Sequence, residues 1–369
     1  MIEPFTIDVP QADLDDLTQR LTHARWPDEL PDVGWDYGIP LARVKELAQY
    51  WATGFDWRKH EARLNELPQY TTEIDGQRIH FVHLRSDRQD ALPLILTHGW
   101  PGSFLEFEKL IEPLKENFHL VIPSIPGFGF SGPTHEKGWG VPRVARAWAE
   151  LMSRLGYDRY GAHGGDFGSG ISRALAGIAP DKVIGLHLTY LPGPPPPGVT
   201  FDLDEEDTRR LARIKQLIAN RPAYQSLQAT RPQTIAYALT DSPVGQLAWI
   251  AEKYTEWTDP ESEISPDEIL TNVSLYWLTG TAGSSARLTK ETAGIAPPLC
   301  PVPVGVAVMP HDITLAVRAH VEYLFDVHQW TEFEQGGHFS ALEVPRQLAA
   351  DITAFFAKIQ SRASTAAGA

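Results

Sequence analysis

Cysteine and positive charge are scarce in this sequence, and each shortage excludes a class of protein. Cys300 is the only cysteine among 369 residues, which excludes an intrachain disulfide and a metal site built from several thiolates. Lysine and arginine number 32 against 47 aspartate and glutamate residues, and the formal net charge is −15. Such an acidic chain is a poor partner for nucleic acid and for anionic membrane surfaces. We expect a cytoplasmic protein, because a single cysteine fits a reducing compartment.

Long hydrophobic segments are absent as well. The sequence has no run of about 18 uninterrupted apolar residues, which is the length that a transmembrane helix needs. The N-terminal stretch MIEPFTIDVPQADLDDL has neither the basic region nor the apolar region of a signal peptide. The sequence therefore predicts no signal peptide and no membrane anchor.

Proline and glycine divide the chain into four parts. The first contains amphipathic helical patterns and no residue that suggests catalysis, so we expect an extension packed onto the rest. The second and fourth parts alternate short apolar runs with helical patterns, whereas the third is mostly helical. The predicted parts are an extension at 1–70, a core at 71–192 and 296–369, and an inserted helical cap at 193–295. The proline-rich run LPGPPPPGVTF (191–201) suits a stiff exit from core to cap.

The two core segments predict a mostly parallel sheet with helices on both faces. A hairpin begins the core, with Asp75 and Gly76 at its turn. One helix is predicted at 141–156 and another directly after residue 166. This alternation of strands and helices is typical of the α/β class. The predicted buried strands are 92–99, 119–127, 160–166, 182–190, 303–310 and 329–335.

The stretch GGDFG (164–168) places Asp166 between a predicted strand and a predicted helix. A sharp turn at this point needs small neighbours, because a Cβ atom would clash there. Many hydrolases carry a nucleophilic serine in such a turn, which exposes the side chain at the carboxyl edge of the sheet. Asp166 is therefore the candidate nucleophile. The competing interpretation is that Asp166 only caps the following helix.

Two later residues complete a candidate catalytic set. In hydrolases with this turn, an acid and then a histidine follow the nucleophile along the chain. Asp312 follows the strand pattern PVGVAVMP and His338 follows QWTEFEQ, so both lie at the edge where parallel sheets place their sites. The alternative for His338 is an ordinary loop histidine. Other acids are less suited, because they lie in the intervening helix or on the strand: Glu322, Asp326 and Glu332.

The loop HGWPGS (98–103) follows another predicted strand. Hydrolases of this kind build an oxyanion hole from a backbone N–H of this loop and that of the residue after the nucleophile. We assign the two donors as Trp100 and Phe167. His98 suggests a metal ligand or a base, but a role in ordering the loop is favoured. The glycine-rich PGFGFSGP (126–133) lacks the spacing of a dinucleotide site, and we expect no cofactor and no metal.

A carboxylate nucleophile narrows the chemistry. Attack on an ester would form an anhydride, whereas displacement at a saturated carbon opens an epoxide or expels a halide and leaves an alkyl–enzyme ester. His338, oriented by Asp312, can then activate water for attack on the carbonyl carbon of Asp166. Epoxide opening also needs an acid near the leaving oxygen. The sequence leaves four cap tyrosines open for this role: Tyr224, Tyr237, Tyr254 and Tyr276.

Characteristic motifs are spread along nearly the whole chain. They are RWPDE, HGWPGSFLEF, IPGFGFSGP, GGDFGSGIS, TDSPVGQLAWIAEKYTEW, LYWLTGT and GGHFSALEVP. Together they resemble the microsomal-type epoxide hydrolases of the α/β-hydrolase fold. The resemblance implies Asp166 as nucleophile, Asp312 as acid and His338 as base, and it selects Tyr224 as the catalytic tyrosine before TRPQT. The implied partners are a small-molecule epoxide and water, and a homodimer stays open.

One position departs from this resemblance. The family has a second cap tyrosine shortly after the LYW motif, and the matching position here is Thr289. A threonine hydroxyl is shorter than a phenol and a weaker acid. Either Tyr224 suffices, another cap group contributes, or the substrate is unusual.

Other functions compete with epoxide hydrolysis. A haloalkane dehalogenase uses the same nucleophile, but such enzymes tend to hold the halide with a tryptophan beside it, where this chain has Phe167. A non-catalytic binding protein predicts a lost member of the catalytic set, yet all three are present. An ester or lactone hydrolase would prefer serine at position 166. Among epoxides, a tryptophan-rich cap favours a bulky apolar or aromatic substrate.

Overall fold

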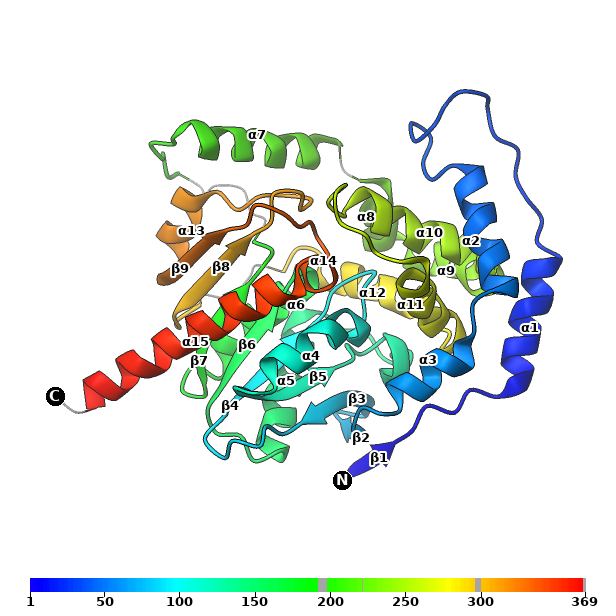
Figure 1. The fold of residues 1–369 in the computed structure, drawn as a ribbon. Helices are drawn as coiled ribbons and strands as arrows, with labels where there is room; N and C mark the ends of the chain where they lie inside the picture. The colour runs from blue at the N-terminus through cyan, green and yellow to red at the C-terminus, as the bar shows by residue number, and fades with distance from the viewer. Residues whose placement is uncertain (192–197, 221, 296–299, 368–369) are drawn as a thin grey trace.

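Within the described residues, one sheet runs through the molecule and carries helices on both faces (Figure 1). The computed structural model describes residues 1–191, 198–220, 222–295 and 300–367. Its strands are, in chain order, β1 Ile2–Phe5, β2 Gln69–Ile74, β3 Gln77–Leu84, β4 Leu92–Thr97, β5 Phe118–Pro123, β6 Tyr160–Gly164, β7 Val183–Leu188, β8 Val304–Val308 and β9 Val327–Glu332. Side by side, the strands follow the order β1-β2-β3-β5-β4-β6-β7-β8-β9.

Helices connect these strands and cover them. In chain order they are α1 Gln11–Thr22, α2 Leu41–Thr53, α3 Trp57–Leu64, η1 Phe104–Phe107, α4 Glu108–Leu114, η2 Gly129–Ser131, α5 Val141–Arg154, α6 Asp166–Ile178, α7 Glu205–Asn220, α8 Ala223–Thr230, α9 Pro232–Asp241, α10 Pro243–Glu256, α11 Pro266–Leu278, α12 Ala282–Thr292, α13 Arg318–Leu324, α14 Ser340–Glu343 and α15 Pro345–Ala367. The segments η1 and η2 are short 3₁₀ helices.

The strand directions confirm the predicted fold class. Strands β1, β2, β3 and β5 pair antiparallel in that order. Every pair from β5 to β9 across the rest of the sheet is parallel. The parallel half is therefore the part whose carboxyl ends meet at one edge, which is where ligand sites form in such sheets.

Side chains of successive strand residues alternate between the two faces of the sheet. In β4, Leu94 and Leu96 belong to a hydrophobic cluster that includes residues of α4 and α15. Ile95 lies between them in the sequence and belongs to the other cluster, with residues of α5 and α6. Both faces of the parallel sheet are thus covered, which explains why its strands read as continuous apolar runs.

The predicted hairpin at the start of the core is confirmed. Asp75 and Gly76 connect β2 to β3, with φ of 54° and 71°. A two-residue hairpin turn of this kind needs positive φ at both positions. Strand β1 was not predicted from the sequence. It pairs antiparallel with β2, and Ile2 lies opposite Thr72. Its four residues include Pro4, which lacks an N–H donor and is tolerated only because β1 is an edge strand.

The predicted buried strands are confirmed with changes in their bounds. Most are shorter than predicted, and β6 ends at Gly164 so that Asp166 already belongs to α6. Strand β9 lies at Val327–Glu332 instead of 329–335. It is an edge strand whose residues are only half-buried, so its hydrophobic pattern marks its ends poorly. The predicted helix over 141–156 is α5, and Gly156 follows it with a φ of 81°.

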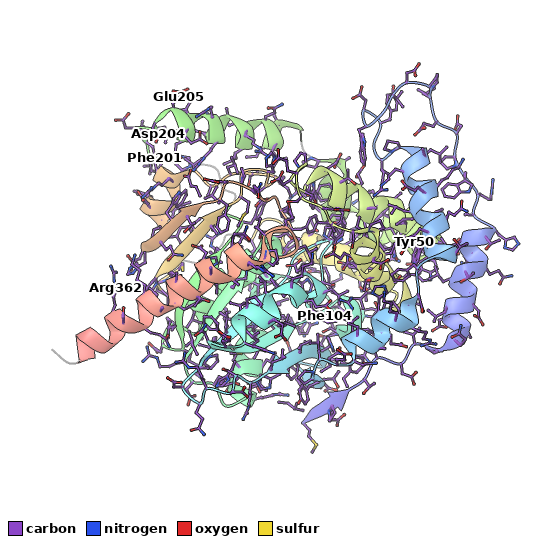
Figure 2. The ribbon with its side chains drawn as sticks, viewed as in Figure 1. Tyr50, Phe104, Phe201, Asp204, Glu205 and Arg362 are labelled. Carbon is purple, nitrogen blue, oxygen red and sulfur yellow. The ribbon has the colours of Figure 1, made fainter. Side chains whose placement is uncertain are left out.

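The helices between β7 and β8 form two separate groups. Helices α8 to α12 pack together and lie between the sheet and helices α1 and α2 (Figure 1). Helix α7 instead lies beside the core, because the carboxylate of Asp207 accepts hydrogen bonds from the first N–H groups of α13 at Arg318 and Ala319. Phe201, just before α7, packs on His320 of α13 (Figure 2). Most of the proline-rich run at 191–201 lies outside the described residues.

The N-terminal helices pack onto this helical group. Helices α1 and α2 contact α10, while α2 and α3 contact α11. The hydroxyl of Tyr50 donates to Asp267 at 2.7 Å, and Figure 2 shows this tyrosine where α2 meets the inserted helices. The indole N–H of Trp51 donates to the hydroxyl of Ser274 at 2.9 Å. The extension thereby ties the inserted helices to the edge of the sheet through β1.

Candidate active site

Asp166 occupies a strained turn between β6 and α6. Its φ is 46°, in the left-handed region that residues other than glycine rarely adopt. The turn is also tightly packed, because a Cβ at Gly168 would lie 1.8 Å from the carbonyl oxygen of Thr97. Gly165 occupies the N-cap position of α6. The interpretation of Asp166 as an ordinary helix cap is therefore wrong. A backbone strained in this way keeps Asp166 a candidate functional residue.

Backbone donors face the carboxylate of Asp166. The N–H of Trp100 donates to Oδ1 of Asp166 at 2.8 Å. Burial raises the pKa of Asp166 above its usual range, while the charge of His338 and the N–H groups of Trp100 and Phe167 offset part of this effect. Both predicted oxyanion donors thus interact with the carboxyl group of the candidate nucleophile. This is the carboxyl group on which a tetrahedral oxyanion would form during ester hydrolysis.

His338 lies between the two predicted aspartates. Its Nδ1 is 2.7 Å from Oδ1 of Asp312, and its Nε2 is 3.8 Å from Oδ2 of Asp166. The side chains of His338 and Asp312 are 4% and 3% exposed. Asp312 is fixed in turn, because its Oδ1 also accepts the N–H of Ile313 at 2.7 Å. The structure therefore brings together the three residues that the chain order selected.

The neighbouring carboxylates control the charge of His338. Burial lowers its pKa, but the charge and hydrogen bond of Asp312 and the charges of Asp166 and Glu106 prevail and raise the pKa to about 9. The ring is consequently protonated at neutral pH while Asp166 is a free carboxylate. The backbone of His338 is also fixed, because its N–H donates a hydrogen bond to the backbone carbonyl of Trp257 at 2.8 Å.

The other acids near Asp312 are engaged elsewhere. Glu322 pairs with Arg318 along α13. Asp326 lies 2.8 Å from the ring of His328, and Glu332 pairs with Arg210 at 3.0 Å. The choice of Asp312 over these residues thus agrees with the geometry.

The loop that carries Trp100 is held from both sides. His98 is fully buried, its Nδ1 lies 3.0 Å from the carbonyl of Gly99, and its Nε2 accepts the N–H of Ile125 at 3.1 Å. Burial lowers the pKa of His98 to about 4, so its ring is neutral. These bonds use both ring nitrogens, which supports the loop-ordering role over a metal or base role. From α11, Asn272 donates to the carbonyl of Pro101 at 2.8 Å.

Three of the four candidate tyrosines have other positions. Tyr237 is 71% exposed on α9. The hydroxyl of Tyr276 donates to the carbonyl of Gly102 at 2.7 Å, so this residue supports the loop. Tyr254 stacks on Phe339 with ring centroids 4.3 Å apart and is buried. Exposure therefore argues against Tyr237, and the bond to Gly102 argues against Tyr276.

Tyr224 is the tyrosine of the inserted helices that lies next to the loop carrying Trp100. From α8, its ring stacks on Trp100 with centroids 5.2 Å apart and packs against Trp257 at 5.3 Å. Burial raises the pKa of Tyr224, and the charge of Asp166 raises it further. The phenol therefore keeps its proton at neutral pH. Trp257 also contacts the ring of His338, so these aromatic rings form one continuous wall.

Comparisons with known proteins agree with this geometry. Residues 2–107 match the model of the epoxide hydrolase N terminus, and residues 93–241 match that of the alpha/beta hydrolase fold. A relative from Stigmatella aurantiaca is 45% identical over 98% of this chain and 86% of its own length. Epoxide hydrolase 1 of Sus scrofa is 34% identical over 98% of this chain and 90% of its own.

A solved structure gives the same result. The epoxide hydrolase of Aspergillus niger superposes with a TM-score of 0.91 at 36% identity, and 97% of each chain is covered. The chain belongs to the epoxide hydrolase family. The resemblance to the microsomal-type members and the α/β-hydrolase fold are thereby confirmed.

This member of the epoxide hydrolase family has a buried threonine where the second cap tyrosine was expected. Thr289 lies on α12 and its hydroxyl donates to Oε1 of Gln228 on α8 at 3.0 Å. Gln228 lies one helical turn after Tyr224. Thr289 therefore joins two inserted helices, and its short side chain holds the helix that carries Tyr224.

The sequence analysis missed two groups of this site. Tyr190 follows β7 and meets the ring of His338 edge-on at 5.5 Å. Burial raises its pKa well above the usual range, and the charges of Asp166 and Asp312 add to this. Its position at the end of a predicted strand could have indicated a site residue, because sites form at the carboxyl ends of parallel strands. Glu106 of η1 lines the cavity beside Asp166 and His338, but its sequence context FLEFEK reads only as a helical surface.

The described part of the chain has neither a membrane-spanning helix nor a metal-binding cluster. No helix there is both long and apolar enough to cross a membrane. No cluster of three or more histidine, cysteine, aspartate or glutamate side chains in those ranges has the geometry of a metal site.

Proposed function

We propose that this chain hydrolyses an epoxide to a vicinal diol in two steps that both take place at Asp166. The observation that supports this most directly is the strained carboxylate of Asp166, which faces two backbone donors and His338. A carboxylate in this position can displace an oxygen from a saturated carbon and form an alkyl ester. Family relatives named epoxide hydrolases support the same substrate class.

In the first step, an oxygen of Asp166 attacks one epoxide carbon, and the bond from that carbon to the epoxide oxygen breaks. The departing oxygen needs a proton or a hydrogen bond. Tyr224 is the proposed donor, because its phenol stays protonated and its ring stacks on Trp100, whose N–H binds Asp166. The products of this step are the Asp166 alkyl ester and a hydroxyl group on the neighbouring carbon.

In the second step, water attacks the carbonyl carbon of the Asp166 ester. Esterification removes the negative charge of Asp166, which is one of the charges that raise the pKa of His338. The ring then releases its proton more easily. This proton can restore the phenol of Tyr224, which lost its own proton in the first step, and the neutral ring can accept a proton from the attacking water. The N–H groups of Trp100 and Phe167 stabilise the oxyanion, and its collapse releases the diol and restores Asp166.

We further propose that α8 to α12 act as the cap over the substrate. Tyr224 comes from this part, and its ring joins Trp100 and Trp257 in an apolar wall. Such a wall favours a bulky apolar or aromatic epoxide, because these rings offer large contact areas and no charge. A polar epoxide would leave its own groups without hydrogen bonds against the same wall.

An assay with two small substrates tests this function. Styrene oxide should yield phenylethanediol, whereas 1-chlorobutane should release no chloride. Chloride release without diol formation would instead identify a dehalogenase. The outcome expected here agrees with Phe167 beside the nucleophile, because its side chain cannot donate a hydrogen bond to a halide.

A further inference from the structure

A small cavity lies beneath the nucleophile, and the two proposed steps do not account for all of its walls. Glu106, Asp166 and His338 line it, together with His163. The volume open to the centre of a water molecule is about 20 Å³. One water needs roughly 10–15 Å³ by this measure and two to four polar partners. The cavity therefore fits one water molecule in contact with the nucleophile and the base.

Glu106 is placed against this cavity by the same loop that carries Trp100. A Cβ at Gly102 would lie 2.2 Å from Oε2 of Glu106, and a Cβ at Gly99 would lie 2.3 Å from Oδ1 of Asp166. A larger residue at either position would therefore displace one of the two carboxyl groups. Gly99 and Gly102 lie on either side of Trp100 in the sequence. The loop thus packs the carboxyl group of Asp166 against Gly99 and that of Glu106 against Gly102.

Electrostatics leave Glu106 mostly neutral at pH 7. Burial raises its pKa, His338 lowers it and Asp166 raises it, to about 8 overall. A neutral carboxyl group still has a carbonyl oxygen that accepts a hydrogen bond. It also adds no negative charge that would oppose the oxyanion. Three further polar side chains line the cavity: His163, Thr189 and Ser340. Of these, His163 is occupied by its contact with His187, where the two Nδ1 atoms are 3.0 Å apart.

We propose that Glu106 accepts a hydrogen bond from the hydrolytic water and holds that water in the cavity between Asp166 and His338. This inference rests on the proposed two-step function. One proton of the water is bonded to Glu106, and the other passes to Nε2 of His338 as the water oxygen bonds to the ester carbon. The oxyanion then collapses, the bond from that carbon to the alkyl oxygen breaks, and this oxygen takes the proton from His338. Asp166 is left as a carboxylic acid, and passing its proton to His338 restores the carboxylate and the protonated ring. Glu106 takes no part in the first step.

Two substitutions at one position test the role. Glu106→Gln keeps a carbonyl oxygen of the same reach, whereas Glu106→Leu keeps the size and removes the acceptor. Stopped-flow tryptophan fluorescence with styrene oxide separates ester formation from ester hydrolysis, since Trp100 and Trp257 adjoin Asp166 and His338. We expect Glu106→Leu to slow hydrolysis about 100-fold and to leave ester formation within about threefold. Glu106→Gln should stay within about fivefold in both steps.

Three outcomes would overturn the inference. They are equal slowing of both steps in Glu106→Leu, unchanged hydrolysis in that variant, and a loss in Glu106→Gln as large as in Glu106→Leu. Glu108→Leu is the matched control, because Glu108 is two residues away, also half-buried and outside this cavity. It should change neither step.

The proposed function itself is checked separately in His338→Gln. An alkyl adduct on the peptide that contains Asp166 shows that the two-step scheme holds, whatever Glu106 does. If no adduct forms in His338→Gln with styrene oxide, the two-step function fails, and the assignment of Glu106 fails with it. An adduct together with unchanged hydrolysis in Glu106→Leu would refute only the role of Glu106.

Discussion

The two sides of the proposed active site are built in different ways. On the core side, Asp166, Asp312 and His338 lie at the ends of parallel strands and are fixed by several hydrogen bonds each. On the cap side, Tyr224 comes from a helix and is held mainly by ring stacking. In the proposed mechanism, the core side sets which bonds can form, while the cap side sets which substrate is presented and how its oxygen leaves.

This contrast explains why the family departure falls where it does. Thr289 lies on the cap side, where helices are joined by side-chain contacts that can be exchanged without moving the sheet. On the core side, a Cβ at Gly164 would lie 2.4 Å from the backbone of Gly168 in α6, and a Cβ at Gly168 would lie 1.8 Å from the carbonyl oxygen of Thr97 in β4, so either change would push α6 away from the sheet. Substitutions should therefore affect chemistry most on the core side and affect substrate opening or stability on the cap side.

The largest effect is expected for Asp166→Asn on the core side. Removing the nucleophile should lower kcat by about 10⁴-fold or more, because ester formation cannot start. Asparagine tolerates the left-handed backbone of this turn, so the melting temperature should stay close to that of the unchanged protein. Diol formation and thermal unfolding measure the two properties. Retained turnover in the absence of deamidation to aspartate would contradict the assignment.

A second core-side effect concerns stability and pH. The folded-state pKa of His338 is about 9, above its unfolded value of about 6.5. The stabilisation from its charge is therefore complete below pH 6.5 and is lost as the pH rises to about 9. We expect His338→Gln to remove about 3 kcal/mol of this pH dependence between these values. Denaturant unfolding at both pH values measures the change in unfolding free energy between them. The same change in the variant and in the unchanged protein would refute the prediction.

On the cap side, Tyr224→Phe should slow ester formation by about 100-fold and leave hydrolysis of the ester little changed. The phenyl ring keeps the stacking on Trp100, so only the proton donor is lost. Tyr237→Phe is the matched control, because this tyrosine is exposed on the neighbouring helix. Pre-steady-state kinetics separate the two steps. Slower hydrolysis with normal ester formation would place Tyr224 in the wrong step.

The smallest effect is expected for Thr289→Val. The change preserves shape but leaves Oε1 of the buried Gln228 without its donor, which should cost about 1–3 kcal/mol of unfolding free energy. Both chemical steps should remain within about twofold. A tenfold loss of kcat with unchanged stability would show that Thr289 acts in the chemistry after all, in place of the missing tyrosine.

The same contrast decided what could be predicted from the sequence. The strands and the order Asp166, Asp312, His338 were accessible, because buried strands have continuous apolar runs and their ends meet at one edge of the sheet. The residues alone left four tyrosines open, since helical spacing does not say which helix faces the nucleophile. Glu106 was not predicted, because its role depends on a loop backbone that passes over its carboxyl group.

The edge of the sheet was also beyond prediction. Strand β1 has only four residues, and its pairing with β2 is a contact between segments far apart in the sequence. The position of α7 beside α13 likewise depends on hydrogen bonds from Asp207 to a helix that comes much later in the chain. Contacts of this kind leave no local pattern in the sequence.

A single turnover in heavy-oxygen water, with enzyme in excess over styrene oxide, tests the central claim most directly. If water attacks the carbonyl carbon of the Asp166 ester, the diol from the first turnover carries no label, and the label appears in the peptide that contains Asp166. If the first diol is labelled and that peptide is not, water attacks the epoxide directly and Asp166 is not the nucleophile.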